Sequence, residues 1–178
     1  MPARSSKSVL RTLRIPSAMD AVLQRDSEEK GISVNALVSA MITKYAEWDR
    51  FAERFGMVTT TRAGHVTLMD VVPEPELLRH AEEAGSRNAK EMTLFWFKKL
   101  DLESFLAYLR IVCRYGGILE MEVEREGRSA VVSLHHEMGP KFTRWLRAFM
   151  TAATREVVGV APKIRAGHSS IIFRIDPP

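Results

Sequence analysis

The sequence has a single cysteine, Cys113, and no run approaching 18 consecutive apolar residues. One cysteine cannot form an internal disulfide, which fits a reducing compartment, and without a long apolar run no membrane-spanning helix is expected. The opening MPARSSKS has no apolar stretch after its basic residues, so we expect no secretion signal and a cytoplasmic protein. The hydrophobic content of 46% is sufficient for one medium domain or two small ones.

Acidic residues are absent from the first 16 positions. This stretch carries a formal charge of +4, which equals the net charge of the whole chain, so the remaining residues balance at 22 basic and 22 acidic side chains. Positive charge concentrated in this way attracts phosphate and adds salt-dependent affinity for nucleic acid. The alternative is a solvated basic tail.

Residues 8–15 alternate as a β-strand does. Val9, Arg11, Leu13 and Ile15 fall on one face, and Ser8, Leu10, Thr12 and Arg14 on the other. Pro16 ends this strand because it has no N–H to donate. No second strand follows, although a lone strand leaves its backbone groups unpaired, so the pattern predicts a pairing partner from elsewhere.

Two helices are predicted next. The first begins with Ser17 as its expected N-cap, runs to about Lys30 and is ended by Gly31. The second follows Ser33, a second expected cap, and has a wide apolar stripe made of Val34, Leu37, Val38, Met41, Ile42 and Tyr45. Because the narrow first helix cannot cover this stripe, and about 40 residues rarely fold unaided, a second copy of the chain is the simplest partner.

The order of a strand, LRIP, a helix, GIS and a second helix (SVNALVSAMITKY) resembles the ribbon-helix-helix DNA-binding domains of the Arc/MetJ/CopG type. The resemblance covers residues 8 to about 48. It implies that two chains pair their first strands as an antiparallel ribbon that enters the major groove of DNA. The expected partners are therefore double-stranded DNA and a homodimer or higher even homo-oligomer.

The resemblance, together with the pleat of the strand, assigns roles to individual side chains. Leu10, Thr12 and Arg14 would point at the bases, and Arg14 can bond guanine as a fork. Leu10 departs from the usual polar residue there, although it can contact a thymine methyl group. The expected phosphate contacts are Arg4, Lys7, Arg11, Ser33, Val34 and Asn35, the last three through backbone N–H groups at the start of the second helix. The alternative for Ser33 is a cap with no role in binding.

The rest of the chain predicts a second domain. We place the DNA-binding domain at residues 1–48, a helical connector and linker at 49–64 and a C-terminal domain at 65–178. Residues 66–72 could be a strand and residues 74–85 a short helix. The later elements are a strand at 91–99, a helix at 102–117, a hairpin at 118–137 that turns at Glu126 and Gly127, a helix at 139–159 and a strand at 169–175. This β-α-β-β-α-β order predicts a ferredoxin-like domain with both helices on one face of the sheet, hence an α+β fold class.

A ribbon-helix-helix domain before a ferredoxin-like domain is similar to the layout of nickel-responsive repressors. His135, His136 and His168 would be the candidate ligands, but the H-x-H motif of that family is absent. Adjacent residues of a strand also point to opposite faces, so His135 and His136 are poorly placed to share an ion. We therefore expect no metal and no cofactor. We expect no enzyme either, because no nucleophile or phosphate loop accompanies these histidines.

The sequence therefore predicts a dimeric transcriptional regulator, a repressor that binds specific double-stranded DNA. Two alternatives stay open. One is a metal- or metabolite-responsive repressor with its effector, a small molecule or ion, bound in the C-terminal domain. The other is the antitoxin of a toxin–antitoxin pair.

Overall fold

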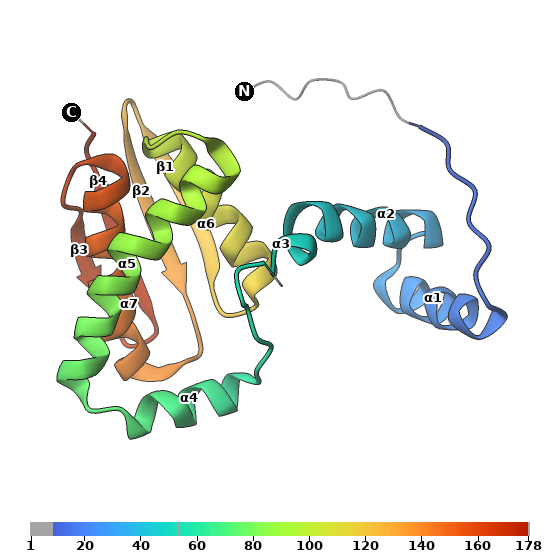
Figure 1. Ribbon diagram of the computed structural model, residues 1–178, viewed down its shortest axis with the longest axis horizontal. Coiled ribbons are helices and arrows are strands. Elements are labelled where there is room, and N and C mark those ends of the chain that lie inside the picture. The colour runs from blue at the N-terminus through green and yellow to red at the C-terminus, as the bar shows by residue number, and fades with distance from the viewer. Residues whose placement is uncertain (1–8, 53, 178) are drawn as a thin grey trace. The chain divides into compact units, whose positions relative to one another are not determined.

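A computed structural model describes residues 9–52 and 54–177 (Figure 1). The chain forms two compact units that divide between Arg50 and Phe51. The regular secondary structure of the described residues consists of helices and one four-stranded antiparallel sheet, which confirms the α+β class. None of the helices in these ranges combines the length and the apolar character needed to cross a lipid bilayer.

The N-terminal unit is helical after residue 16. It contains α1 (Ser17–Lys30), α2 (Val34–Lys44) and a π-helical turn η1 (Tyr45–Asp49), after which α3 (Arg50–Ala52) crosses into the next unit. Gly31 ends α1 in the left-handed region with φ 63°, as predicted. The predicted N-cap of α1 is wrong by one position, because the cap is Pro16, whose carbonyl oxygen accepts the N–H groups of Met19 and Asp20. The cap of α2 is Ser33, as predicted.

The C-terminal unit has four helices of ten residues or more and four strands. They are α4 (Arg62–Val71), α5 (Glu74–Phe97), α6 (Leu102–Gly116), β1 (Glu120–Glu126), β2 (Ser129–His135), α7 (Gly139–Val158), β3 (Lys163–Ala166) and β4 (Ser170–Ile175). All neighbouring strands are antiparallel, in the order β1-β2-β4-β3. The predicted hairpin is confirmed as β1 and β2, and its turn holds Gly127 at φ 61°.

The predicted ferredoxin-like topology is wrong. Residues 91–97 are the end of α5 rather than a strand, and residues 66–71 belong to α4. A short strand that the sequence pattern did not reveal, β3, pairs with β4. The order of elements from α6 onward is therefore α-β-β-α-β-β, and the strand order is not that of a ferredoxin-like sheet.

The core of the C-terminal unit lies between one face of the sheet and the helices α6 and α7. Phe105, Leu109 and Leu146 from the helices are buried against Val132 and Phe173 from the strands. The helix α5 packs along α7, and Figure 1 shows it crossing in front of the sheet. Gly85 of α5 is buried at this crossing, where a Cβ atom would lie 3.1 Å from Ala152 Cβ.

Candidate nucleic-acid interface and C-terminal pockets

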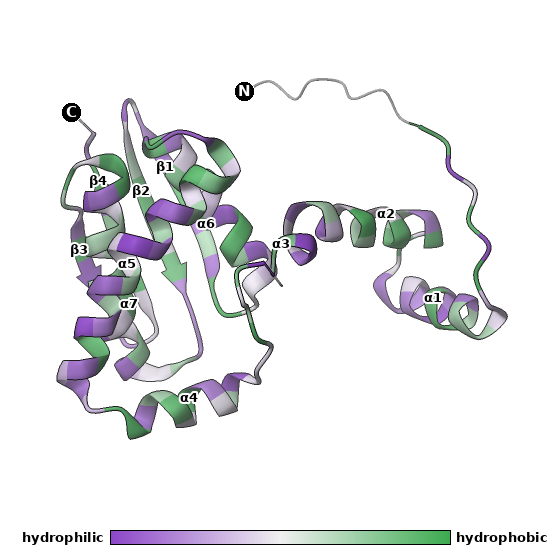
Figure 2. Cartoon of the chain, viewed as in Figure 1, coloured by the Kyte–Doolittle hydropathy of each residue, from purple (hydrophilic) through white to green (hydrophobic). Residues whose placement is uncertain are grey.

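Residues 9–16 form neither helix nor strand in the single chain of this structure. Within the described part of the chain, residues 9–15 make no backbone hydrogen bond. Figure 2 shows hydrophobic and hydrophilic residues alternating along this segment. The predicted ribbon needs the strand of a second chain, so the strand and its pairing stay a prediction.

The predicted base and phosphate contacts in this segment are all solvent-exposed. Leu10, Arg11, Thr12 and Arg14 lie on the segment, and 93% of the Leu10 surface is accessible. Arg4 and Lys7 lie outside the described residues. The structure therefore brings four of the six predicted ribbon and arm residues onto one accessible stretch of backbone.

The N-terminal unit buries little of its apolar surface. Leu37, with 8% of its surface accessible, is the one large hydrophobic side chain that is buried within residues 9–50. Ten of the fifteen exposed large hydrophobic side chains of the described residues lie between Val9 and Tyr45. Those ten are Val9, Leu10, Leu13, Ile15, Met19, Val22, Ile32, Met41, Ile42 and Tyr45. The described part of this unit therefore exposes most of its large hydrophobic side chains.

The start of α2 is capped by a side chain. Ser33 Oγ accepts the backbone N–H of Ala36 at 3.1 Å. The N–H groups of Val34 and Asn35 precede the first intrahelical hydrogen bonds, so they remain available to an acceptor outside the helix. Ser33 and Asn35 are exposed, and Val34 is half-buried. The geometry thus allows the cap and an anion contact at the same helix end.

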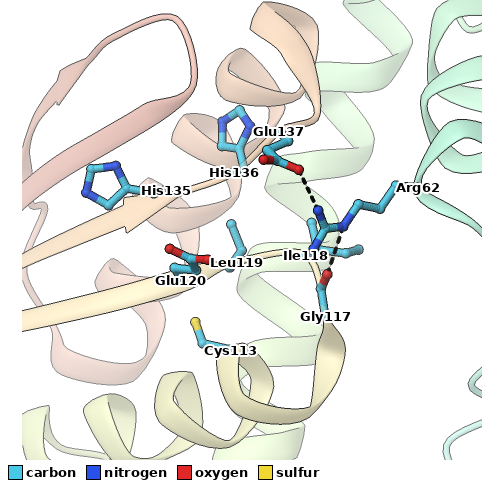
Figure 3. A pocket seen from close by; sticks show the side chains of 9 residues that line it. All are labelled: Arg62, Cys113, Gly117, Ile118, Leu119, Glu120, His135, His136 and Glu137. Carbon is cyan, nitrogen blue, oxygen red and sulfur yellow. Dashed lines mark hydrogen bonds and ion pairs between the residues drawn. The ribbon is translucent and has the colours of Figure 1, made fainter. Parts of the chain in front are cut away.

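In the C-terminal unit, two of the three candidate metal ligands, His135 and His136, line a pocket of about 380 Å³ (Figure 3). His135 is exposed and His136 is buried, and their rings point in different directions in Figure 3. His168 is exposed in the loop between β3 and β4. Within the described residues, no three His, Cys, Asp or Glu side chains come together as a metal site would require.

Arg62 lines this pocket. Its Nη1 donates to Glu137 Oε2 at 2.6 Å, and its Nε donates to the carbonyl oxygen of Gly117 at 3.2 Å (Figure 3). Both contacts tie the start of α4 to segments that flank the sheet, so the guanidinium is already engaged. Sequence reasoning missed this residue, because nothing in the local pattern of RAGH indicates a contact with a carboxylate 75 positions later.

His136 is held by two hydrogen bonds, one to each ring nitrogen. Nδ1 accepts the N–H of Met138 at 3.2 Å, which leaves the proton of the neutral ring on Nε2. Nε2 lies 3.0 Å from Thr143 Oγ1, which itself donates to the carbonyl oxygen of His168 at 2.8 Å. The pKa of His136 is lowered because burial disfavours the charged ring, with further repulsion from His135 and His168. This histidine therefore joins β2, α7 and the β3–β4 loop as a neutral group.

A second, smaller pocket of about 180 Å³ lies between α4, α6 and α7. Its lining is almost entirely apolar and includes Tyr108, Phe142, Trp145 and Phe149. Only 4% of the Tyr108 surface is accessible, and burial raises the pKa of its hydroxyl. An apolar pocket of this size can hold one small apolar molecule.

No protein-family model, no curated protein and no solved structure matches this chain. The described residues form an α+β protein with a helical N-terminal unit and a C-terminal unit that combines helices with a four-stranded sheet. The ribbon-helix-helix resemblance therefore stands on the sequence pattern alone.

Proposed function

We propose that the chain is a transcriptional repressor that binds specific double-stranded DNA as a dimer through a ribbon-helix-helix domain. The observation that carries this proposal is the near absence of a core in the N-terminal unit, where Leu37 is the one buried large hydrophobic residue among those described. Burying one exposed leucine or isoleucine contributes about 1.5–3 kcal/mol. A second copy can cover Leu13, Ile15 and the exposed face of α2 together.

The alternation of residues 9–15 supports a ribbon. If two copies pair these residues as antiparallel strands, their unpaired backbone groups gain partners, and Leu13 and Ile15 turn towards the helices. Leu10, Thr12 and Arg14 then face outwards on a narrow two-stranded surface that fits the major groove. Arg14 is the residue that reads sequence best, since it can bond O6 and N7 of guanine together.

The charge distribution supports DNA as the ligand of this surface. The first 16 residues have four basic and no acidic side chains, whereas the rest of the chain is balanced. Arg4, Lys7 and Arg11 would neutralise phosphates, and the start of α2 at Ser33, Val34 and Asn35 would hold another. These contacts fix the position of the protein on the duplex but carry no sequence information.

The decisive experiment compares operator and random DNA for Arg14→Ala. The DNA upstream of the protein's own gene serves as the first operator candidate. We expect the variant to lose discrimination by about 1–3 kcal/mol, because one bidentate base contact disappears. Arg25→Ala is the matched control, because it removes the same charge from the exposed surface of α1. If wild type and Arg14→Ala discriminate equally between operator and random DNA, the ribbon does not read the base sequence.

A salt titration tests the phosphate contacts separately. Arg4→Ala and Lys7→Ala should weaken binding to every sequence and make the dependence of affinity on salt shallower by about one unit of slope each. An unchanged slope would make the arm a solvated tail. Leu13→Glu tests the dimer, because it places a charge on the inward face of the ribbon. We expect this variant to lower the measured mass of the assembly formed by the full chain and also to abolish operator binding.

The apolar pocket supports a second candidate function, a repressor whose DNA affinity responds to a small apolar metabolite. Benzene is a suitable probe, since a dry cavity of about 150 Å³ is known to bind it. Benzene should raise the unfolding temperature of the wild-type chain, and Val112→Phe, which fills the pocket from α6, should remove the effect. If benzene does not raise the unfolding temperature of the wild-type chain, the pocket is a packing defect and not a ligand site.

A further inference from the structure

Within the described residues of the C-terminal unit, no helix packs on one face of the sheet. The main contacts between strands and helices join α6 to β1 and α7 to β3 and β4, and the buried residues of these helices belong to the core on the other face. The alternation of the strands places a second set of side chains on the uncovered face. That set is Glu120, Glu122, Glu124, Glu126, Ser129, Val131, Ser133, His135, Lys163, Arg165, Ser170, Ile172 and Arg174. All of these residues are exposed or half-buried.

Charges of opposite sign are separated across this uncovered face. The edge strand β1 contributes only glutamates to it, whereas the opposite edge contributes Lys163 and Arg165 from β3 and Arg174 from the neighbouring β4. The central strand β2 places only serine, valine and a terminal histidine between them. The face therefore has an acidic side and a basic side about three strand spacings, or roughly 14 Å, apart.

Part of this charge has no partner among the residues that the structure describes. Arg174 pairs with Glu126 and with Asp176, and Lys163 Nζ lies 3.4 Å from Asp176 Oδ2. In the described residues, Glu120, Glu122, Glu124 and Arg165 take part in no ion pair. Both the acidic edge and the basic edge thus retain charged side chains with which a partner could form ion pairs.

The register of the sheet aligns the two edges row by row. One row runs from Glu122 through Ser133 and Ile172 to Arg165. The next row runs from Glu124 through Val131 and Arg174 to Lys163. Each of these two rows therefore begins with a carboxylate and ends with a basic side chain.

We propose that two copies of this chain pack these faces together about a two-fold axis that runs parallel to the strands. Such an axis places β1 of one copy over β3 of the other and keeps the rows in register, so Glu122 meets Arg165 and Glu124 meets Lys163 of the second copy. An axis that lies in the interface and crosses the strands would instead place glutamates over glutamates. The charge pattern selects the first arrangement.

The middle of the face permits the approach that this packing requires. Ser133, Val131 and Ser129 are small, and Ile172, with 44% of its surface accessible, gains burial when it is covered. Stacked sheets lie about 10 Å apart, which such side chains can fill. This interface is separate from the pairing of residues 9–15 and goes beyond DNA binding, so each can fail without the other.

Site-specific cross-linking of the full chain tests the geometry. In a Cys113→Ala background, Glu122→Cys with Arg165→Cys should yield covalent dimers with a bismaleimide whose reach of about 10 Å matches the sheet spacing. The two cysteines of one chain lie roughly 14 Å apart and cannot be joined by this reagent. Each single cysteine variant should give no dimer. Glu122→Cys with Arg147→Cys is the matched control, because Arg147 lies exposed on α7, beyond the opposite face.

Charge exchange tests the same contact without cross-linking. We expect Glu122→Arg to weaken association of the full chain about tenfold at low salt, because two symmetry-related contacts become repulsive. Arg165→Glu should do the same, and the two changes together should restore association. Sedimentation equilibrium measures each constant. Association that is unchanged in both single variants, or covalent dimers from Glu122→Cys alone, would overturn the proposal.

Discussion

Gly85 lies where α5 contacts α7, so replacing it even with alanine should destabilise the C-terminal unit. Gly85 is buried on α5, and a Cβ atom there would collide with the carbonyl oxygen of Phe149 and lie 3.1 Å from Ala152 Cβ. The Phe149 oxygen belongs to the backbone of a 20-residue helix, so it cannot turn aside as a side chain would. Gly85→Ala must therefore push the two helices apart.

The expected size of the effect follows from two opposing terms. Overpacking a tight core contact costs about 1–3 kcal/mol. Alanine is favoured over glycine inside a helix by about 1 kcal/mol, which offsets part of that cost. We expect Gly85→Ala to lower the free energy of unfolding of the C-terminal unit by up to about 2 kcal/mol.

Urea unfolding followed by circular dichroism and tryptophan fluorescence measures this change. Gly116→Ala on α6 is the matched control, because the nearest atom to its added Cβ, Val112 Cγ1, lies 3.9 Å away. The control should leave the midpoint unchanged or raise it slightly. If Gly85→Ala behaved like Gly116→Ala, the close packing of α5 on α7 would be refuted.

Three further predictions concern single side chains. The pKa of His136 is lowered in the fold, so below pH 6.5 the unfolded chain binds more protons than the folded chain. The free energy of unfolding of the wild type should therefore fall as the pH drops through this range. His136→Gln should flatten the pH dependence of the urea midpoint. Burial raises the pKa of Cys113 to about 11, so its thiol should react slowly with Ellman's reagent near neutral pH and rapidly in urea; a fast native reaction would show an accessible thiolate. Ser33→Ala should cost about 1 kcal/mol of N-terminal stability while Ser33→Asp retains the cap, as thermal melts can establish.

Much of the local structure was readable from the sequence. The strict alternation of Met121 and Val123 with glutamates predicted β1, and Gly127 predicted its turn to β2. Ser33 and Gly31 predicted the break between α1 and α2. In each case one or two residues have a strong local preference that the tertiary structure does not oppose.

The misread end of α5 has a physical reason. Residues 91–97 are apolar on most sides, which erases the period that separates a helix from a buried strand. The structure explains this composition, because α5 is covered from more than one direction. Phe95 stacks edge-on against Phe51 and Phe55, with ring centres 5.0 Å apart in each case, while the buried Thr93 is packed into the interior.

The short strand β3 could not have been found from periodicity. It has four residues and a single large apolar side chain, Ile164, between Lys163 and Arg165. Its place in the sheet depends on pairing with β4 across a loop in which the N–H of Gly167 donates to the carbonyl oxygen of Ser170. The candidate DNA-binding surface is a different case: residue types and phase predict it, but its assembly depends on a second chain.

The strand order β1-β2-β4-β3 bears on how the C-terminal unit reaches its native state. The sheet consists of two local hairpins, β1 with β2 and β3 with β4, that are joined only by the ladder between β2 and β4. All of α7 separates those two strands in the sequence, so this ladder has the greatest loop-closure entropy to overcome. We expect each hairpin to form quickly by itself and the docking of one on the other to set the folding rate.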